Sequence, residues 1–240
     1  MATSSLPART GSGLIAGVVL AGGLARRMGG GDKSLLKLGD RTILDSVLER
    51  LSGQVDLIAL NANGDPSRFE RPGLPVVPDT FPGRCGPLAG VLAGMDWAHS
   101  EQAEHIVTVA ADTPYFPRTL VAGLMASREI EGRPIALAAS TRSGRRNLHP
   151  TFGFWPVELR ESLRDSLSRG IRKVVDWTEI HGAAIANFEF GEFDPFFNIN
   201  TPDDLELARR RGRAVEESGA SPSQQGERKG DSGSGIEKLN

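Results

Sequence analysis

The sequence predicts an α/β domain built on a parallel sheet with helices on both faces. The first observation behind this prediction is an alternation of apolar, β-branched segments with helical segments through roughly the first 140 residues. The second is that glycine, asparagine or aspartate follows directly after several of the strand-like segments. Ligands of such sheets bind beyond the carboxyl ends of the strands, so the polar residues are expected to converge on one site there.

The first 140 residues contain four apolar segments that predict strands, at residues 14–20, 55–60, 106–110 and 135–139. Residues 74–77 are expected to be short and extended. A helix is expected between an N-cap at Thr42 and a stop at Gly53, because apolar residues recur there at helical spacing. A second helix opens with Pro87, which suits a first helical turn, and runs to residue 98. A third is expected over residues 118–128.

The second half of the chain is less regular. Strands are predicted at residues 151–155 and 183–190, and helices at residues 157–168 and 171–180. Thr201 is a plausible cap for a last helix with acids in its first turn.

Polar composition at the two ends divides the chain into three parts. We expect a flexible leader at residues 1–13, a single folded domain at residues 14–213, and a disordered polar tail at residues 214–240.

Composition excludes several classes of function. The 240 residues carry a formal net charge of −2, so no overall field attracts nucleic acid or a membrane surface. No apolar run approaches the roughly 20 residues that cross a bilayer, and no secretory signal is expected at the start. The single cysteine, Cys85, cannot form an internal disulfide, which fits a reducing compartment, and we expect the protein in the cytoplasm.

The segment after the first strand is rich in glycine and in positive charge. It matches neither the dinucleotide-binding pattern G-x-G-x-x-G nor the Walker A loop, because Asp32 stands where the latter needs glycine before Lys33. The ingredients still suit a phosphate site. Gly22 and Gly23 allow backbone N–H groups to approach a phosphate closely, and nearby Arg and Lys side chains can neutralise its oxygens.

The run LAGG, three residues, RMGG, one residue, DK, from Leu20 to Lys33, resembles the signature of nucleotidyltransferases that handle a nucleoside triphosphate. In this detailed form it is similar to the molybdenum cofactor guanylyltransferase (MobA) family. Further segments similar to that family follow in order: Asn61, VPD at 77–79, GPLAG at 86–90, ADTP at 111–114, HP at 149–150 and FNINTPDDL at 197–205. The resemblance implies a Rossmann-like three-layer α/β/α sandwich of the nucleotide-diphospho-sugar-transferase type, with a mostly parallel sheet and an antiparallel strand.

The resemblance also implies an activity, the transfer of GMP from GTP to the terminal phosphate of molybdopterin with release of pyrophosphate. Joining two polyanions requires positioning, basic side chains and a divalent cation, and the implied cofactor is Mg²⁺. The attacking phosphate is already ionised at neutral pH, so no general base is required. This agrees with the lack of a compelling Ser-His-Asp or Cys-His arrangement in the sequence.

The family pattern implies roles for particular residues of this chain. The implied catalytic residues are Lys33, Arg27 and Asp112, with Asp112 also the Mg²⁺ ligand. The implied GTP-binding residues are Leu20, Ala21, Gly22, Gly23, Lys33, Asn61, Asp79 and Asp112. The implied acceptor-binding residues are His149, Asn198 and Asn200.

Structural explanations for several of these residues stay open at this point. Asn61, Asp79 and Asp112 are also common turn residues after strands. Asn198 and Asn200 share one face of an extended segment, and that segment could instead cap the helix at Thr201.

Two other functions also fit the sequence. One is a related transferase that uses CTP or a sugar phosphate, although the LAGG form of the loop favours the guanine enzyme by resemblance. The other is a nucleotide-binding sensor without catalysis, against which the intact Lys33 and Asp112 argue. Expected partners are GTP and molybdopterin, with transient contacts to other cofactor-biosynthesis proteins or to molybdoenzyme chaperones.

Overall fold

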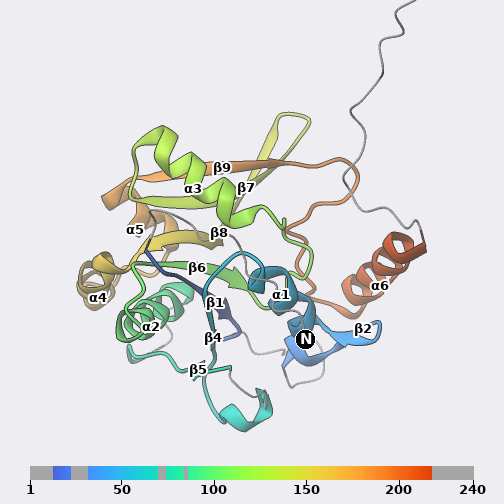
Figure 1. The fold of residues 1–240 in the computed structure, drawn as a ribbon, viewed down its shortest axis with the longest axis horizontal. Helices are drawn as coiled ribbons and strands as arrows, with labels where there is room; N and C mark the ends of the chain where they lie inside the picture. Colours follow the sequence, from blue (N-terminus) through green and yellow to red (C-terminus); the bar gives the residue numbers. More distant parts are fainter. Residues whose placement is uncertain (1–12, 23–31, 70–73, 84–85, 218–240) are drawn as a thin grey trace, which may run out of the picture.

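The computed structural model describes residues 13–22, 32–69, 74–83 and 86–217, and for residues 212–217 it describes the backbone alone (Figure 1). Its main sheet has the strand order β5-β4-β1-β6-β8-β7-β9. The strands are β1 (Ile15–Leu20), β4 (Leu57–Asn61), β5 (Val76–Val77), β6 (His105–Ala110), β7 (Ile135–Arg142), β8 (Arg145–Pro156) and β9 (Ala183–Glu189). Within this sheet β8 runs antiparallel to both of its neighbours, and every other pairing is parallel. The predicted mostly parallel sheet with an antiparallel strand is therefore confirmed.

Helices cover both faces of the sheet, which gives the expected three layers (Figure 1). One apolar cluster joins the sheet to α1 (Ile43–Ser52) and α3 (Leu120–Glu131). The cluster on the other face includes α2 (Pro87–Ser100), α4 (Arg160–Ser168) and α5 (Val174–His181). β1 shows why both faces are buried, since Val19 belongs to the first cluster and its neighbour Val18 to the second.

The last helix, α6 (Pro202–Glu217), packs apart from these layers against the start of α1. Ile43 of α1 and Ile199, Leu205 and Ala208 form a small buried cluster there. The domain boundary that we expected after residue 213 falls inside α6. The physical reason is that residues 214–217 contain no helix breaker, so the helix continues to Glu217.

Several element ends differ from those expected. β7 and β8 together extend the predicted strands through a two-residue hairpin loop in which Ser143 (φ 49°) and Gly144 (φ 77°) are both left-handed. The predicted helix over residues 157–168 divides into a 3-10 turn, η4 (Val157–Leu159), followed by α4. A small hairpin of β2 (Lys37–Leu38) and β3 (Arg41–Thr42) was not predicted. The N-cap at Thr42 is confirmed, since its hydroxyl accepts a hydrogen bond from the Asp45 N–H and its own N–H donates to the Asp45 carboxylate.

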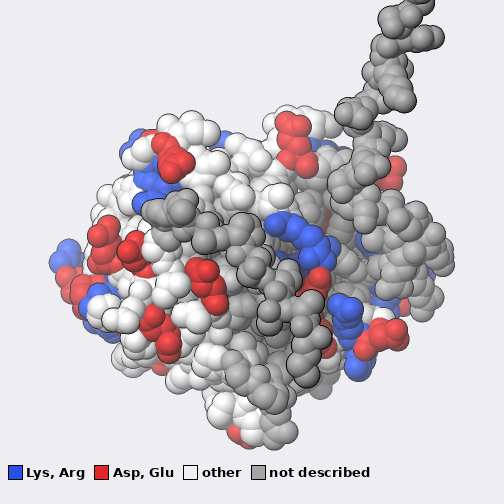
Figure 2. Space-filling model, in the orientation of Figure 1, with Lys and Arg blue, Asp and Glu red and all other residues white. Residues whose placement is uncertain are grey.

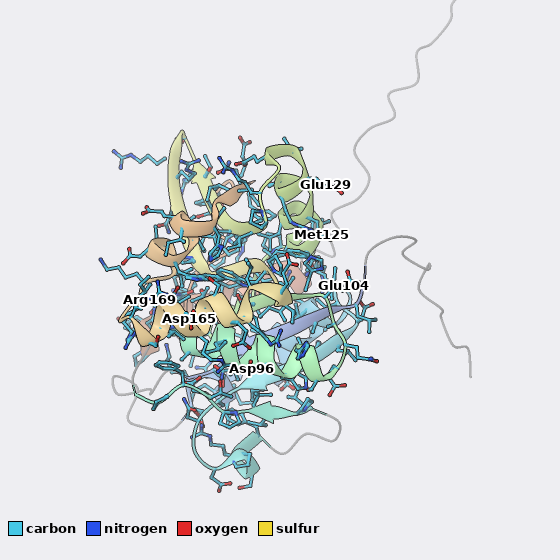
Figure 3. The ribbon with its side chains drawn as sticks, turned by 90° about the vertical axis from the view of Figure 1, so that its left-hand side faces the viewer. Asp96, Glu104, Met125, Glu129, Asp165 and Arg169 are labelled. Atoms are coloured by element: carbon cyan, nitrogen blue, oxygen red, sulfur yellow. The ribbon has the colours of Figure 1, made fainter. Side chains whose placement is uncertain are left out.

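Charged side chains are spread over the surface rather than segregated. Figure 2 shows acidic and basic groups interspersed over the described part of one face. On the side seen in Figure 3, Asp96 of α2 lies close to α4, which carries Asp165 and is followed by Arg169. Arg164 of α4 donates a 2.7 Å hydrogen bond to Asp96. Among the described residues, no helix combines the length and the apolar character that would span a membrane.

The pairing register aligns the carboxyl ends of β1, β4 and β6. Leu20, the last residue of β1, pairs with Asn61 at the end of β4 and with Ala110 at the end of β6. The segments that follow these three strands therefore begin side by side at the carboxyl edge of the sheet, as a parallel sheet requires.

Close contact between α2 and β1 depends on glycine. A Cβ at Gly94 would lie 2.7 Å from Cγ2 of Val18, which is fully buried in the sheet. We expect Gly94→Ala to reduce the free energy of unfolding by about 1–3 kcal/mol, because the helix must move away from the sheet. Urea denaturation measures this loss.

The matched control for this experiment is Gly53→Ala at the end of α1. Gly53 has an ordinary φ of −81° and open space around its Cβ position. We expect this variant to stay within about 0.5 kcal/mol of the wild-type protein. Equal stability of both variants and the wild type would show that α2 does not depend on this close approach.

Candidate active site

A cavity of about 760 Å³ opens at the carboxyl edge of the sheet. Its walls come from the segments that follow β1, β4, β5 and β6, together with the first turn of α2. The lining includes most of the residues that the sequence singled out: Leu20, Ala21, Gly22, Lys33, Asn61, Asp79, Asp112 and Asn198. The expected convergence is thus present for these residues, and the volume is that of a small-molecule site.

Lys33 links three distant segments at this edge. Its ammonium Nζ lies 2.8 Å from Asp112 Oδ2 after β6, and also donates a 2.8 Å hydrogen bond to Asn200 Oδ1 before α6. The side chains of Lys33 and Asp112 are 15% and 23% exposed, so the ion pair is sheltered but still reaches the cavity. A ligand phosphate could therefore take the place of Asp112 as the partner of the ammonium.

Asn200 is held by the start of α6. Asp204 accepts hydrogen bonds from the Asn200 N–H (2.9 Å) and the Thr201 N–H (2.8 Å), and its own N–H donates to the Thr201 hydroxyl. These bonds form a capping box with Thr201 as N-cap, the residue that the sequence suggested as the cap. Although slight burial opposes its ionisation, the bonds from Asn200 and Thr201 hold the pKa of Asp204 below its ordinary value. The same carboxylate therefore caps α6 and holds the backbone of Asn200, whose side chain contacts Lys33.

Asn198 and the Asp112–Thr113 turn are bonded to each other. The Ile199 N–H donates a 2.9 Å hydrogen bond to the Asp112 carbonyl, which attaches the segment before α6 to the end of β6. The Thr113 hydroxyl donates to Asn198 Oδ1, and it lies 3.3 Å from Asp112 Oδ1. Asn198 and Asn200 are thus both linked to the surroundings of Asp112, Asn198 through Thr113 and Asn200 through Lys33.

Asn61 and Asp79 belong to a network that pairs the segments after β4 and β5. The amide Nδ2 of Asn61, which is 3% exposed, donates to the Val77 carbonyl (3.1 Å) and to Asp79 Oδ1 (3.0 Å). Asn63 donates to Asp79 Oδ2 (2.8 Å) and accepts from the Asp79 N–H (2.9 Å). Asn61 therefore helps to orient the Asp79 side chain, and both residues line the cavity.

Asn63 and Arg68 are among the lining residues that were not predicted from the sequence. Arg68 lies in a 3-10 turn, η3 (Pro66–Phe69), and its Nε is 3.1 Å from Asp32 Oδ2. Its Nη2 also donates to the Asn63 carbonyl. Arg68 thus ties the turn after β4 to the residue that precedes Lys33. The one available signal was a second asparagine and an arginine in a polar turn just after a strand end.

The remaining site residues that the sequence analysis singled out are not among the described residues that line the cavity. Gly23 and Arg27, together with Arg26 and Cys85, fall outside the described residues. His149 is not among the residues that line the cavity. It stacks on Phe196, with ring centroids 4.4 Å apart, and its Nε2 lies 2.8 Å from the Ser140 hydroxyl. Burial lowers the pKa of His149, an effect that nearby Asp194 only partly offsets, so the ring is neutral at pH 7.

The donor atoms fit a divalent cation that is shared with a ligand. Among the described residues there is no group of three or more His, Cys, Asp or Glu side chains able to enclose a metal. Mg²⁺ is commonly held by one or two carboxylates plus substrate phosphates, so a single cavity-facing Asp112 is sufficient protein ligation. The amide oxygens of Asn198 and Asn200 add hard oxygen donors beside it.

The amino end of α2 contributes to the same cavity. Gly86, Pro87 and Gly90 line it, and Gly86 takes a left-handed φ of 66° as the chain turns into the helix. Gly90 packs directly on the Asn61 amide, where a Cβ would not fit. The positive end of the helix dipole therefore faces the cavity, which favours an anionic ligand.

Comparisons with known proteins agree with this geometry. A model of the MobA-like NTP transferase domain matches residues 17–183. A molybdenum cofactor guanylyltransferase from Mesorhizobium japonicum is 51% identical over 201 residues, covering 82% of this chain and 95% of that protein. Another from Bradyrhizobium sp. is 50% identical over 199 residues, covering 82% of this chain and 92% of that protein.

Solved structures share the fold at lower identity. Molybdopterin-guanine dinucleotide biosynthesis protein A from Archaeoglobus fulgidus superposes with a TM-score of 0.62 at 23% identity, over 83% of this chain and 99% of that chain. A 4-diphosphocytidyl-2C-methyl-D-erythritol synthase from Anaerococcus prevotii gives a TM-score of 0.64 at 13% identity, over 84% and 96% of the two chains.

The fold and the family match together define an enzyme of the nucleotidyltransferase class. The two relatives of about 50% identity, which this chain covers over more than nine tenths of their length, narrow this class further. The chain belongs to the molybdenum cofactor guanylyltransferase family, within the MobA-like NTP transferases.

Gly22 offers a test of the cavity that is separate from folding. A Cβ there would meet no described atom within 4 Å, and Gly22 lines the cavity. We expect Gly22→Ala to change the free energy of unfolding by less than about 0.5 kcal/mol. The methyl group would enter the space where backbone and phosphate approach each other, so nucleotide affinity should fall about tenfold or more. Urea denaturation and calorimetric titration with a nucleoside triphosphate measure the two effects, and unchanged affinity would remove Gly22 from the site.

Proposed function

We propose that the protein transfers GMP from GTP to the terminal phosphate of molybdopterin, which yields molybdopterin guanine dinucleotide and pyrophosphate. The observation that carries the proposal is the Lys33–Asp112 pair, bonded to Asn200 and open to a cavity at the strand ends. The relatives at about half identity are named for guanylyl transfer in molybdenum cofactor synthesis, which supports the choice of nucleotide and acceptor.

The reaction joins two phosphates. A phosphate oxygen of molybdopterin attacks the α-phosphorus of GTP, and the bond from that phosphorus to the oxygen bridging to the β-phosphate breaks. Pyrophosphate leaves with the electron pair of the broken bond. Because the attacking phosphate is already ionised, the protein must position two anions and offset their repulsion rather than remove a proton.

The positions of the described residues in and around the cavity support the roles that we propose for them. The backbone of residues 20–22 lies against the nucleotide, and Lys33 moves from Asp112 to a phosphate of GTP. Asp79, held by Asn61 and Asn63, accepts a hydrogen bond from an N–H of guanine. Asn198 and Asn200 line the acceptor side.

The proposal includes a metal ion and two residues outside the described part of the chain. Asp112 would hold Mg²⁺, which supplies charge neutralisation and orientation of the phosphates when it is bound. Gly23 is assigned to the nucleotide turn, and Arg27 to the triphosphate. The single cysteine of the sequence fits a reducing compartment, and we assign the protein to the cytoplasm, in transient contact with other cofactor-biosynthesis proteins or molybdoenzyme chaperones.

Mass spectrometry of the products tests the function directly. The purified protein is incubated with molybdopterin, MgCl₂ and GTP, CTP, ATP or UTP in parallel. We expect the guanine dinucleotide to be the main product. A cytosine dinucleotide as main product would favour the CTP-dependent alternative, and nucleotide binding with no transfer at all would favour a sensor.

Asp112 should be required for transfer but not for folding. We expect Asp112→Asn to reduce kcat by about 10²–10³-fold, because the carboxylate that would hold the metal is lost while its shape is kept. Steady-state kinetics measures the loss, and a titration with Mn²⁺ should show weaker metal binding.

The matched control is Asp165→Asn on α4, which exchanges an exposed carboxylate on a side helix for an amide (Figure 3). It should keep the wild-type rate. Full activity of Asp112→Asn would show that this carboxylate does not hold the metal.

Lys33 should matter chiefly for the triphosphate. We expect Lys33→Ala to lower kcat/KM for GTP by about 10²-fold, since one charge-assisted contact to phosphate disappears. Lys37→Ala, which removes an exposed lysine four residues away, should stay near the wild-type value. Unaltered kinetics of Lys33→Ala would place the triphosphate away from this side chain.

A further inference from the structure

The segment between β9 and α6 brings Asn198 and Asn200 to the site, and it is fastened at both ends. Its downstream end is the capping box of α6 described above. Its upstream end is Asp194, whose Oδ1 accepts a 2.9 Å hydrogen bond from the Phe196 N–H and whose Oδ2 accepts a 2.9 Å bond from the Ser140 hydroxyl. The same hydroxyl lies 2.8 Å from Nε2 of His149. Ser140 of β7 therefore stands between His149 of β8 and Asp194.

Counting protons fixes the direction of these bonds. A serine hydroxyl has one proton, and a carboxylate can only accept. The Ser140 hydroxyl donates to Asp194 Oδ2, so its one proton is committed to that side chain. The contact between Ser140 and His149 must then be donated by the ring. His149 carries its proton on Nε2, and the chain of donors runs from His149 through Ser140 to Asp194.

Ring packing keeps His149 in this position. Its plane lies 14° from that of Phe196, at a centroid distance of 4.4 Å. Phe196 is 3% exposed and makes an edge contact with Phe152 of β8, with ring centroids 5.0 Å apart. The ring and the donor chain together hold the residues immediately before Asn198 against β7 and β8.

We propose that His149, Ser140 and Asp194 form a hydrogen-bond relay that positions the segment carrying Asn198 and Asn200 beside Asp112. Beyond the relay, this segment meets the site through three contacts: Ile199 to the Asp112 carbonyl, Asn198 to Thr113, and Asn200 to Lys33. His149 is thus a positioning residue that acts through the segment, in place of the acceptor ligand expected from the sequence. The effect on transfer rests on the proposed function, whereas the relay itself does not.

The first experiment observes the relay in the wild-type protein. Nitrogen NMR of protein with ¹⁵N-labelled histidine distinguishes a protonated ring nitrogen from a bare one, and His149→Gln identifies the signal. We expect protonated Nε2 and bare Nδ1 at pH 7.5. The opposite tautomer would overturn the proposal, because Ser140 would then donate to His149 and not to Asp194.

The second experiment separates the relay from ring packing. His149→Phe keeps an aromatic ring over Phe196 but has no N–H, whereas His149→Gln keeps an N–H donor near the position of Nε2. We expect the Phe variant to show faster hydrogen exchange at the Ile199 amide and a kcat about tenfold lower, with KM for GTP within about twofold. The Gln variant should restore both values to within about threefold of wild type.

A second Ser–His pair in the same protein provides the matched control. Ser162 of α4 lies 2.9 Å from Nε2 of His181 of α5, on elements that do not line the cavity. Ser162→Ala should leave kcat and the exchange of the Ile199 amide unchanged, whereas Ser140→Ala should behave like His149→Phe.

The outcomes separate this proposal from the proposed function. Wild-type exchange and kcat in His149→Phe, or equal losses in the Phe and Gln variants, would overturn the relay. If the wild-type protein forms no guanine dinucleotide, the proposed function fails, and the tautomer and the exchange of the Ile199 amide still decide whether the relay exists.

Discussion

The ion pair between Lys33 and Asp112 is the interaction on which the site depends. It joins the segment after β1 to the segment after β6, and Asn200 adds the segment before α6. Partial burial makes each charge costly to leave alone, so neither side chain can be removed without exposing the other to an unfavourable environment. Both partners are also the groups that a metal-bound triphosphate needs, a cation for phosphate and a carboxylate for the metal. The pair therefore keeps the site assembled in a form that a nucleotide can open by exchanging partners.

The pairing register of the sheet aligns the strand ends from which the site is built. Leu20 pairs with both Asn61 and Ala110, so three strands end together. Glycine at positions 90 and 94 lets α2 lie directly against the ends and centre of these strands, and this brings its positive end to the cavity. The close approach of α2 to the sheet thus determines both how the core packs and where the positive end of the helix lies.

The sequence predicted those parts of the site that follow from local pattern. Because polar residues follow the parallel strands, the sequence predicted that Asn61, Asp79 and Asp112 converge. The hydroxyl residues Thr42 and Thr201 predicted where two helices begin, since each caps its helix. The role of Arg68 was not predicted, because its partner Asp32 is distant in the sequence. The residues around Arg68 in its polar turn do not indicate which acid it pairs with. The extension of β7 and β8 to the tip of their hairpin was not predicted. The arginine-rich tip is exposed on both faces, so it lacks the alternation of apolar and polar residues that identifies a strand.

The charges around the cavity set a condition for binding a polyanion. Among the described lining residues, the two cations Lys33 and Arg68 are each paired with an aspartate, and Asp79 is a third acid held by amide donors. A triphosphate that approached this arrangement unaccompanied would meet no unpaired positive side chain in the described lining. Within the described part of the chain, attraction comes from the amino end of α2. In the proposed function, Arg27 and a metal ion held by Asp112 would add to it, and Lys33 would then be free to bind a phosphate. On that proposal, binding of the metal by Asp112 would free Lys33 for a phosphate, so the site would favour the metal-bound nucleotide over the free one.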